Sequence, residues 1–201
     1  MKKIIALILF VALLACMASC KKEEEPPKIE EKTVYETLDE LSDKSYQQIK
    51  LSIVTSKGDI ELAAVYTLTA SNVSFMVEQL NKLPTDGNLT GVPFNYKTAH
   101  TGTAKIVGGE VTELDGAPVT LPSYDELKGS FNFDKDNFEN VFSGESSFVA
   151  DVKAPSAFLG ITANVQNMKL SVQFNENALV KITISYQLDG ASVTTTYEFT
   201  A

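Results

Sequence analysis

The segment 168–200 carries the pattern that most limits how the chain can fold, an alternation of apolar and polar side chains in three successive stretches. A repeat of two residues places every apolar side chain on one face of a β-strand. Asp189-Gly190 separates the second stretch from the third, and this pair is typical of a two-residue type I′ hairpin turn, because glycine accepts a positive φ. The segment is therefore predicted to form a three-stranded antiparallel meander with one buried face.

A second hairpin is predicted at the start of the folded part. Apolar and polar residues alternate over 49–53 and again over 60–68, and Gly58 and Asp59 between them are typical of turns. One face of this hairpin is also expected to be buried, since a shift of one residue in either strand would expose its apolar set.

Two short helices are predicted around the first hairpin. Thr33 and Glu36 have the spacing of a capping box, and apolar residues at helical intervals follow them. This predicts an amphipathic helix over 34–46 that packs on its own domain. The apolar residues expected on one face of a second helix, capped by Ser71, are Val73, Val77 and Leu80.

The part of the chain between the two hairpins has less regular patterns. The segment 83–91 is predicted to be a loop, and 134–142 a short helix that ends near Gly144. Further strands are predicted at 92–97, 103–107, 117–121, 129–133, 146–152 and 157–165. This order of elements indicates an α+β, β-rich class, in which an antiparallel sheet forms either a barrel or a sandwich with one or two short helices.

Residues 1–19 have the anatomy of a secretory signal peptide. Two lysines precede an unbroken apolar run over 4–14, and small residues follow it. The run is shorter than the ~20 residues that a membrane-spanning helix needs. The chain has two cysteines, Cys16 and Cys20, and both stand at the end of this leader.

The segment 17–20 (MASC) resembles the lipobox of bacterial lipoproteins, in which a cysteine after small residues is diacylated and becomes the new N-terminus. The segment 13–16 (LLAC) fits the same pattern, so Cys16 is the alternative to Cys20 as the lipidation site. Cleavage before Cys20 would leave no free thiol in the mature protein, which favours Cys20. The resemblance implies a membrane anchor through an N-terminal diacylglyceryl cysteine in the bacterial cell envelope. An ordinary secretory signal or an uncleaved anchor is the alternative to a lipobox.

A charged tether is predicted between the anchor and the folded domain. Residues 21–32 (KKEEEPPKIEEK) combine two prolines with a dense run of charges, a composition typical of a solvated spacer. Lys21 beside the anchor resembles the outer-membrane routing of lipoproteins and leaves open the periplasmic or the surface face. The expected organisation is a lipoprotein signal peptide at 1–19, a tether at 20–32 and a single β-rich globular domain at 33–201.

Composition and charge exclude some classes of partner. The chain has no arginine, and outside the leader its 15 lysines stand against 26 acidic residues, a net charge near −11. A surface that follows a phosphate backbone needs positive charge, so nucleic acid is excluded as a partner. Without arginine the chain also lacks the bidentate fork that commonly binds carboxylates and phosphates.

Catalytic and metal-binding patterns are sparse. His100 is the only histidine, and neither a G-x-S-x-G elbow nor a set of zinc ligands accompanies it, so we expect a surface histidine, no enzyme and no cofactor. The acidic residues Asp134, Asp136 and Glu139 are the one calcium candidate, although the glycine and the distal glutamate of an EF-hand loop are missing. The alternative for this cluster is a solvated acidic turn.

Short stretches between residues 55 and 127 resemble cyclophilin-type prolyl isomerases. They are TSKGDIEL at 55–62, a helix-like TASNVSFMV at 69–77, KIVGGE at 105–110 and GAPVTLPSYDEL at 116–127. The resemblance implies a shared fold and isomerase activity, which in this family needs an arginine just after a Phe-His pair. Here Tyr96 stands where that arginine is expected after Phe94, and Val107 replaces the glutamine before the glycine pair. The implied activity is therefore that of a degenerate isomerase.

These features together predict a lipid-anchored lipoprotein of the cell envelope whose β-rich domain is non-catalytic and either binds a ligand or has a structural role. Besides the membrane, the expected partners are a small apolar ligand or an envelope protein. The alternatives are a degenerate cyclophilin-like peptidyl-prolyl isomerase and an envelope assembly or adhesion subunit.

Overall fold

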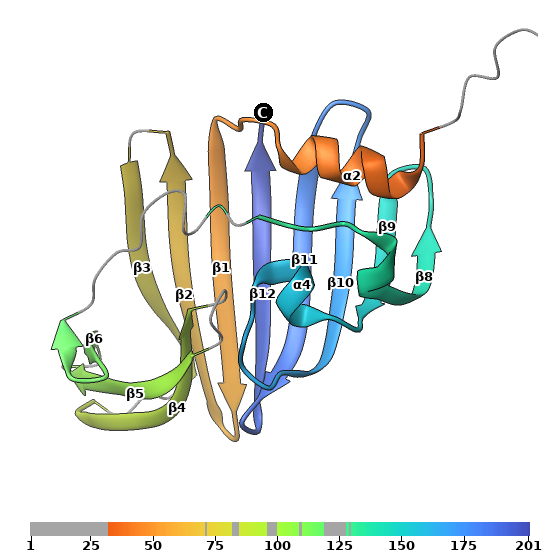
Figure 1. The fold of residues 1–201 in the computed structure, drawn as a ribbon. Coiled ribbons are helices and arrows are strands. Elements are labelled where there is room, and N and C mark those ends of the chain that lie inside the picture. The colour runs from red at the N-terminus through yellow and green to blue at the C-terminus, as the bar shows by residue number, and fades with distance from the viewer. Residues whose placement is uncertain are drawn as a thin grey trace, which may run out of the picture. The chain divides into compact units, whose positions relative to one another are not determined.

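A sheet of eight antiparallel strands forms the main part of the structure, a computed structural model that describes residues 32–70, 72–81, 85–95, 100–108, 110–118, 128 and 130–201 (Figure 1). The strand order in this sheet is β3-β2-β1-β12-β11-β10-β9-β8. The strands are β1 (Gln48–Lys57), β2 (Ile60–Thr69), β3 (Asn72–Asn81), β8 (Phe138–Ser143), β9 (Ser147–Val152), β10 (Gln166–Phe174), β11 (Leu179–Leu188) and β12 (Ala191–Thr200).

Both predicted hairpins are confirmed, and they meet at the centre of the sheet. Strands β10, β11 and β12 form the meander, and β1 and β2 form the other hairpin. The two are joined by pairing of β1 with β12, which places Gln48 opposite Thr200. Asp189 and Gly190 have φ values of 50° and 78°, as the predicted type I′ turn requires.

One face of the large sheet carries the apolar core. Leu51 on β1 lies opposite Tyr197 on β12, and Tyr197 lies opposite Ile182 on β11. All three side chains are fully buried. Full burial of a large apolar side chain contributes about 1.5–3 kcal/mol relative to leaving it exposed. In these strands the apolar residues of the alternating pattern therefore face the core, and the polar residues between them face the other side of the sheet.

Two short helices and a group of aromatic rings cover this face in the described part of the chain. Helices α2 (Val34–Ser42) and α4 (Pro155–Leu159) lie on the same side of the sheet (Figure 1), and Leu38, Leu41 and Phe158 join its core. A 3₁₀ turn, η1 (Lys135–Asn137), leads into β8. The aromatic residues whose rings contact one another here are Tyr35, Phe131, Phe133, Phe138, Phe148, Phe158 and Tyr197.

Helix α2 is fixed at its beginning and just beyond its end. Thr33 and Glu36 form the predicted capping box: Glu36 N donates to Thr33 Oγ1 at 3.3 Å, and Thr33 N donates to Glu36 Oε2 at 2.8 Å. After the helix, Tyr46 Oη donates to the Leu41 carbonyl at 2.8 Å and accepts a hydrogen bond from Leu179 N at 2.9 Å. This buried hydroxyl ties the helix to β11, so the helix packs on its own domain.

A second antiparallel sheet has the strand order β4-β5-β6-β7. Its strands are β4 (Gly87–Asn95), β5 (His100–Val107), β6 (Glu110–Leu114) and β7 (Ala117–Pro118). Leu62 of β2 packs with Ala104 and Ile106 of β5, so a small second core joins this sheet to the large one. Asp115, in the turn between β6 and β7, accepts a hydrogen bond from Thr103 N at 2.7 Å.

The architecture is the β-rich α+β fold that the sequence predicts, in its sandwich-like form. Within the described residues, the outer strands β3 and β8 of the large sheet each pair with one neighbour, so this sheet does not close on itself. The barrel alternative is therefore wrong. Thr33–Ala201 forms one compact unit.

Two predictions after the first hairpin are wrong. The helix predicted at 71–80 is strand β3, which pairs with β2 along its whole length. The cyclophilin resemblance implies a helix in this segment, and the strand contradicts that part of the resemblance. Within the predicted loop at 83–91, strand β4 begins at Gly87, and it continues through 92–95. Pairing with a neighbouring strand outweighs the local sequence signal in both places.

Further differences lie before and after β8. The helix predicted at 134–142 consists of η1 followed by β8, and the strand predicted at 157–165 begins within α4. No strand forms over 130–133, and the first helix ends at Ser42, earlier than predicted. The strands predicted at 103–107 and 146–152 are confirmed as β5 and β9; that predicted at 117–121 forms as β7 over its first two residues, and 119–121 lie outside the described residues.

Candidate functional site

The face of the large sheet that is turned away from the core is polar. Ser52, Thr196, Thr183 and Ser171 stand opposite one another on four adjacent strands and form a row of hydroxyl groups. A solvated face of this kind is ordinary for an antiparallel sheet with a single buried side. The hydroxyl row therefore does not by itself indicate a site.

This polar face changes at β8, where a β-bulge turns an aromatic side chain toward solvent. Glu139 lies opposite Asp151 and Phe142 lies opposite Val149, so β8 carries one residue more than β9 between these pairs. Asn140 lies in the bulge with a φ of 50°, a left-handed conformation that asparagine tolerates better than most residues. The extra residue puts Glu139 and Phe142 on the same face although they are three positions apart. Phe142 is consequently 70% exposed, and Val149 is 44% exposed.

A second bulge lies on β10, on the other side of β9. Gln166 lies opposite Gln187 and Lys169 lies opposite Ser185, so β10 carries an extra residue relative to β11. Asn167 lies in this bulge with a φ of 54°. Bulges bend the strand that carries them and are over-represented beside functional sites. Two of them, each with a left-handed asparagine, therefore flank the C-terminal half of β9.

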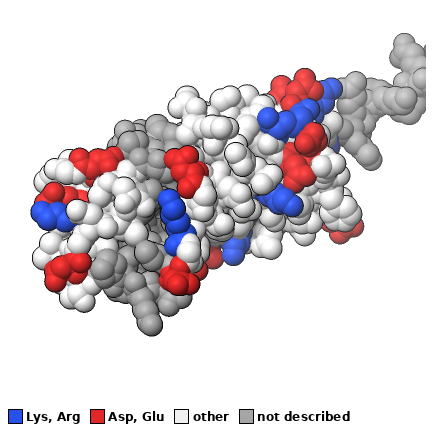
Figure 2. Space-filling model, turned by 90° about the horizontal axis from the view of Figure 1, so that it is seen from below, with Lys and Arg blue, Asp and Glu red and all other residues white. Residues whose placement is uncertain are grey.

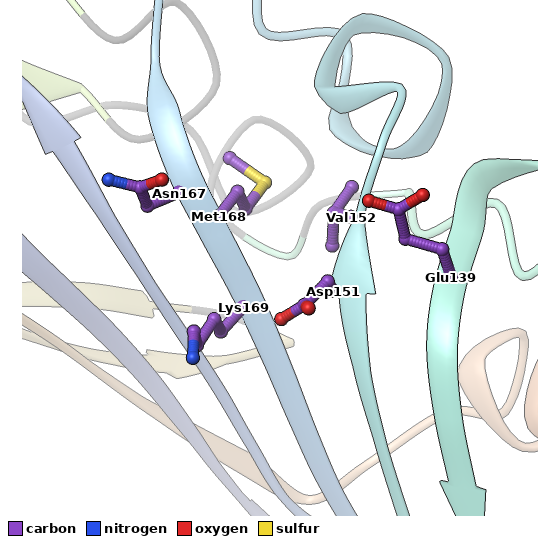
Figure 3. Close-up of a pocket in the computed structure, with 6 residues that line it drawn as sticks. All are labelled: Glu139, Asp151, Val152, Asn167, Met168 and Lys169. Carbon is purple, nitrogen blue, oxygen red and sulfur yellow. The ribbon is translucent and has the colours of Figure 1, made fainter.

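A groove lies where β9 and β10 separate beyond their last pair, Asp151 and Lys169. Its volume is about 600 Å³. Figure 3 shows Asp151 on the middle strand, with Lys169 and Glu139 on the strands at either side. We call it the bulge groove, and the residues that line it are Glu139, Asp151, Val152, Asn167, Met168 and Lys169.

Three residues with charged side chains line the bulge groove, one on each of three adjacent strands. Asp151 stands directly opposite Glu139 on one neighbouring strand and opposite Lys169 on the other. Asn140 Nδ2 donates to Asp151 Oδ2 at 2.8 Å, which fixes the orientation of this partly buried carboxylate. Asn167 adds a carboxamide to the lining. The groove thus presents two carboxylate acceptors, an ammonium donor and an amide, with one excess negative charge.

The acidic residues of the calcium candidate are divided by the fold. Asp134 Oδ1 accepts a hydrogen bond from Asp136 N at 2.9 Å in the turn before β8, whereas Glu139 lines the bulge groove. In the residues that the structure describes, no three histidine, cysteine, aspartate or glutamate side chains gather where they could hold a metal ion.

The other residues singled out from the sequence lie on the second sheet or outside the described residues. Cys16, Cys20 and Tyr96 lie outside the described residues. His100 begins β5, where its backbone pairs with Asn95, and its side chain is likewise outside the described part. Val107 lies on the second sheet and is 49% exposed.

The shifted pKa values of the described residues belong to tyrosines on the core face. Burial raises the pKa of Tyr66 and of Tyr186 to about 12, and the Thr195 hydroxyl opposes this effect at Tyr186. Burial also raises the pKa of Tyr46, and the hydrogen bond from Leu179 N partly offsets this effect by lowering it. Desolvation of a phenol disfavours its charged form, so these hydroxyls stay protonated at neutral pH. The rings belong to the core, and the hydroxyls add no acid or base to the groove.

Sequence reasoning missed most of the bulge groove. Lys169 and Asp151 looked like ordinary solvent-facing residues of alternating strands, and Phe142 looked like part of a helix. An asparagine that interrupts an apolar alternation was the available signal, since asparagine adopts the left-handed conformation of a bulge. Asn140 and Asn167 both carry that signal.

The charged side chains do not separate into areas of one sign on the face that Figure 2 displays. Lysines lie scattered among acidic residues on its described surface. Ion pairs within the two sheets join Lys105 to Glu113 and, at 4.0 Å, Lys181 to Glu198. Exposed pairs of this kind contribute about 0–1 kcal/mol each, so they matter little for stability.

No protein-family model matches the chain, and no curated protein matches its sequence. Among the helices of the described residues, none has both the length and the apolar character needed to cross a bilayer. The geometry of the bulge groove is therefore the main basis for a functional proposal.

Proposed function

We propose that the protein is a lipid-anchored protein of the bacterial cell envelope, routed to the outer membrane, whose β-rich domain binds a ligand in the bulge groove without catalysis. The observation that carries the proposal is the pair of bulges on either side of Asp151. A non-glycine residue with a positive φ costs of the order of 1–3 kcal/mol, and such positions cluster at functional sites. Asn140 and Asn167 are two such residues beside one groove.

The exposed ring of Phe142 supports the same proposal. In an unbulged strand its position would alternate to the core face, where a phenylalanine contributes to stability. The bulge instead leaves the side chain 70% exposed next to the charged groups. Aromatic side chains are enriched in protein–protein interfaces and are common in the lining of small-molecule sites.

The lining of the groove favours binding over catalysis. Its six residues provide carboxylate, ammonium and amide groups that can hold a ligand by hydrogen bonds, and none of the six is a histidine, cysteine, serine or threonine, so the lining has no hydroxyl or thiol nucleophile paired with an imidazole base. Because most of these groups are polar, the groove favours a polar ligand over the small apolar ligand expected from the sequence.

The location in the envelope rests on the sequence, because residues 1–31 lie outside the described residues. The lipobox-like segment that ends at Cys20 and the charged tether that follows support an anchored domain held away from the lipid surface.

An envelope assembly or adhesion subunit is the second candidate. The observation that favours it is the group of exposed apolar side chains at the outer strand β8 and its neighbour: Val141, Phe142 and Val149. A protein partner could cover them, since apolar area at the centre of an interface supplies much of its binding energy.

Photo-crosslinking in native membranes, combined with mass spectrometry, tests the proposal. A photoreactive phenylalanine analogue at position 142 of the full-length protein reports what occupies the groove, and the same analogue at Val107 is the control. The intact mass of the purified protein reports the anchor. We expect a lipidated chain that begins at Cys20 and a non-protein adduct at position 142 only.

Other results would revise the proposal in distinct ways. A single protein partner crosslinked at position 142 would support the assembly candidate instead. Equal labelling at positions 142 and 107 would rule out a site at the groove. A chain that keeps its leader or has no lipid would refute the anchor, whatever the groove binds.

A further inference from the structure

We infer that the bulge groove and the adjoining pair of Phe142 and Val149 bind a saccharide chain that carries no carboxylate or phosphate groups. The inference rests on the proposed function, because it names the class of ligand for the same groove. It combines two features that the structure places side by side: an exposed aromatic ring and a cluster of polar groups with both signs of charge.

The ring and the polar cluster lie on one face of the sheet. Phe142 and Val149 form a cross-strand pair, and Asp151 follows Val149 by two positions on β9. Two residues of a strand span about 7 Å, and alternate residues share a face. A ligand lying on the ring of Phe142 therefore reaches the carboxylate of Asp151 and its neighbour Glu139.

A sugar ring matches this juxtaposition. It has an apolar C–H surface that packs on an aromatic ring, and its rim of hydroxyl groups both donates and accepts hydrogen bonds. The carboxylates of Glu139 and Asp151 accept hydrogen bonds, and the ammonium of Lys169 and the amide of Asn167 donate them. Hydrogen bonds with a charged partner are stronger than those between neutral groups. Asp151 is also held by Asn140, so its orientation is set before a ligand arrives.

Beyond the groove, the same face of the sheet continues as a strip of hydroxyl groups that can form hydrogen bonds with sugars. Ser171 lies opposite Val149, and Ser185 lies opposite Lys169, so hydroxyl groups extend from the groove toward β11 on the same face. Adjacent strands are about 4.8 Å apart, which gives polar contacts at a short, regular spacing. A chain of sugar rings can use this strip, whereas a single ring cannot.

The same features disfavour the competing ligands. Two carboxylates against one ammonium repel an anionic ligand. An extended peptide that adds to the outer edge of β8 needs a regular row of backbone hydrogen bonds, and the bulge at Asn140 interrupts that row. A saccharide placed on the face of the sheet does not depend on the edge.

Isothermal titration calorimetry of the full-length protein in mild detergent tests the inference. The probes are maltotetraose, cellotetraose, tetra-N-acetylchitotetraose and, as the acidic comparison, tetragalacturonic acid. We expect at least one uncharged probe to bind more tightly than the acidic one. Phe142→Ala should weaken that binding roughly tenfold or more, Phe142→Tyr should retain it, and Asp151→Asn should weaken it several-fold. Val107→Ala, which removes an exposed apolar side chain of the second sheet, should leave it unchanged.

Each contrary outcome has its own meaning. Preference for the acidic probe, no binding of any uncharged probe, or equal binding by wild type and Phe142→Ala would overturn the saccharide inference. If crosslinking at position 142 then still captures a specific ligand, the groove remains a binding site for another class. If neither calorimetry nor crosslinking detects an occupant, both the inference and the proposed function are wrong.

Discussion

The buried hydroxyl of Tyr46 joins helix α2 to strand β11 through two hydrogen bonds. Tyr46→Phe keeps the ring but leaves Leu179 N without its acceptor, and the Leu41 carbonyl then still accepts from Lys44 N, at 3.3 Å. Each buried group left unpaired costs about 1–3 kcal/mol, so we expect the free energy of unfolding to fall by at least that amount. Urea unfolding measures it. Tyr35→Phe is the matched control, because the Tyr35 hydroxyl makes no hydrogen bond within the described residues. Equal losses in the two variants would contradict the prediction.

The buried tyrosines also predict a loss of stability in alkali. Burial raises the pKa of Tyr186 in the folded protein to about 12, against 10.0 for a tyrosine in water, so the folded protein holds this proton more tightly than the unfolded chain does. The resulting stabilisation is fully present below pH 10 and is lost as the pH rises from 10 to 12. A shift of this size corresponds to roughly 3 kcal/mol. Unfolding by urea at several pH values should show the loss, and Tyr186→Phe should show a smaller one. An equally steep decline in the variant would refute this assignment.

At the scale of elements, the bulge on β10 depends on the left-handed conformation of Asn167. A β-branched residue in this conformation costs about 1–2 kcal/mol, whereas glycine adopts it freely. We therefore expect Asn167→Val to lower the free energy of unfolding by that amount and Asn167→Gly to change it little. Thermal unfolding compares the two variants with the parent. If Asn167→Val were as stable as Asn167→Gly, residue 167 would not have the left-handed conformation described.

The second sheet depends on a close approach between Gly102 and the turn at Asp115. A methyl group at Gly102 would overlap the Asp115 carboxylate, which accepts a hydrogen bond from Thr103 N. We expect Gly102→Ala to destabilise this sheet by about 1–3 kcal/mol, as other overpacked positions do. Amide hydrogen exchange should increase in β5 and β6 but not in β11. Gly144→Ala is the control, because its methyl group would meet only the Ser147 hydroxyl, at 3.1 Å. Unchanged exchange in β5 would count against the clash.

The elements that sequence reasoning found are those whose one face is buried along their whole length. Strands β1, β10, β11 and β12 bury alternate residues against the core, so their period of two is visible in the sequence. Helix α2 is visible through its capping box. Helix α4 spans only Pro155–Leu159, and so short a stretch has no readable period.

Strand β8 was misread for a reason that also hid the candidate site. Phe138 and Phe142 are four residues apart, which is helical spacing, but the bulge at Asn140 puts Phe138 on the core face and Phe142 on the opposite face of one strand. The same extra residue moves Phe142 to the face that bears Glu139 and Asp151. One local irregularity thus both broke the sequence pattern and shaped the groove. The sequence predicted most of the large sheet, but of the groove lining it singled out only Glu139, and that as part of a calcium candidate.

At the scale of the whole molecule, the proposed anchor predicts different effects at the two cysteines. Cys20→Ala should abolish lipidation, because it removes the thiol that is acylated, and the protein should leave the membrane fraction. Cys16→Ala should retain both the lipid and the membrane association, since this residue would depart with the leader. Membrane fractionation with intact-mass measurement distinguishes these results. Loss of lipid in Cys16→Ala alone would assign the anchor to Cys16.

The pairing of β1 with β12 has a consequence for the order in which the protein can acquire its structure. Gln48 and Thr200 are partners at the centre of the sheet, although nearly the whole domain separates them along the chain. Contacts between such distant residues form slowly, because a long loop must close before they contribute. A chain that is exported amino end first, as proposed here, reaches the far side with β1 long before its central partner. The sheet can be completed only after the last strand has crossed.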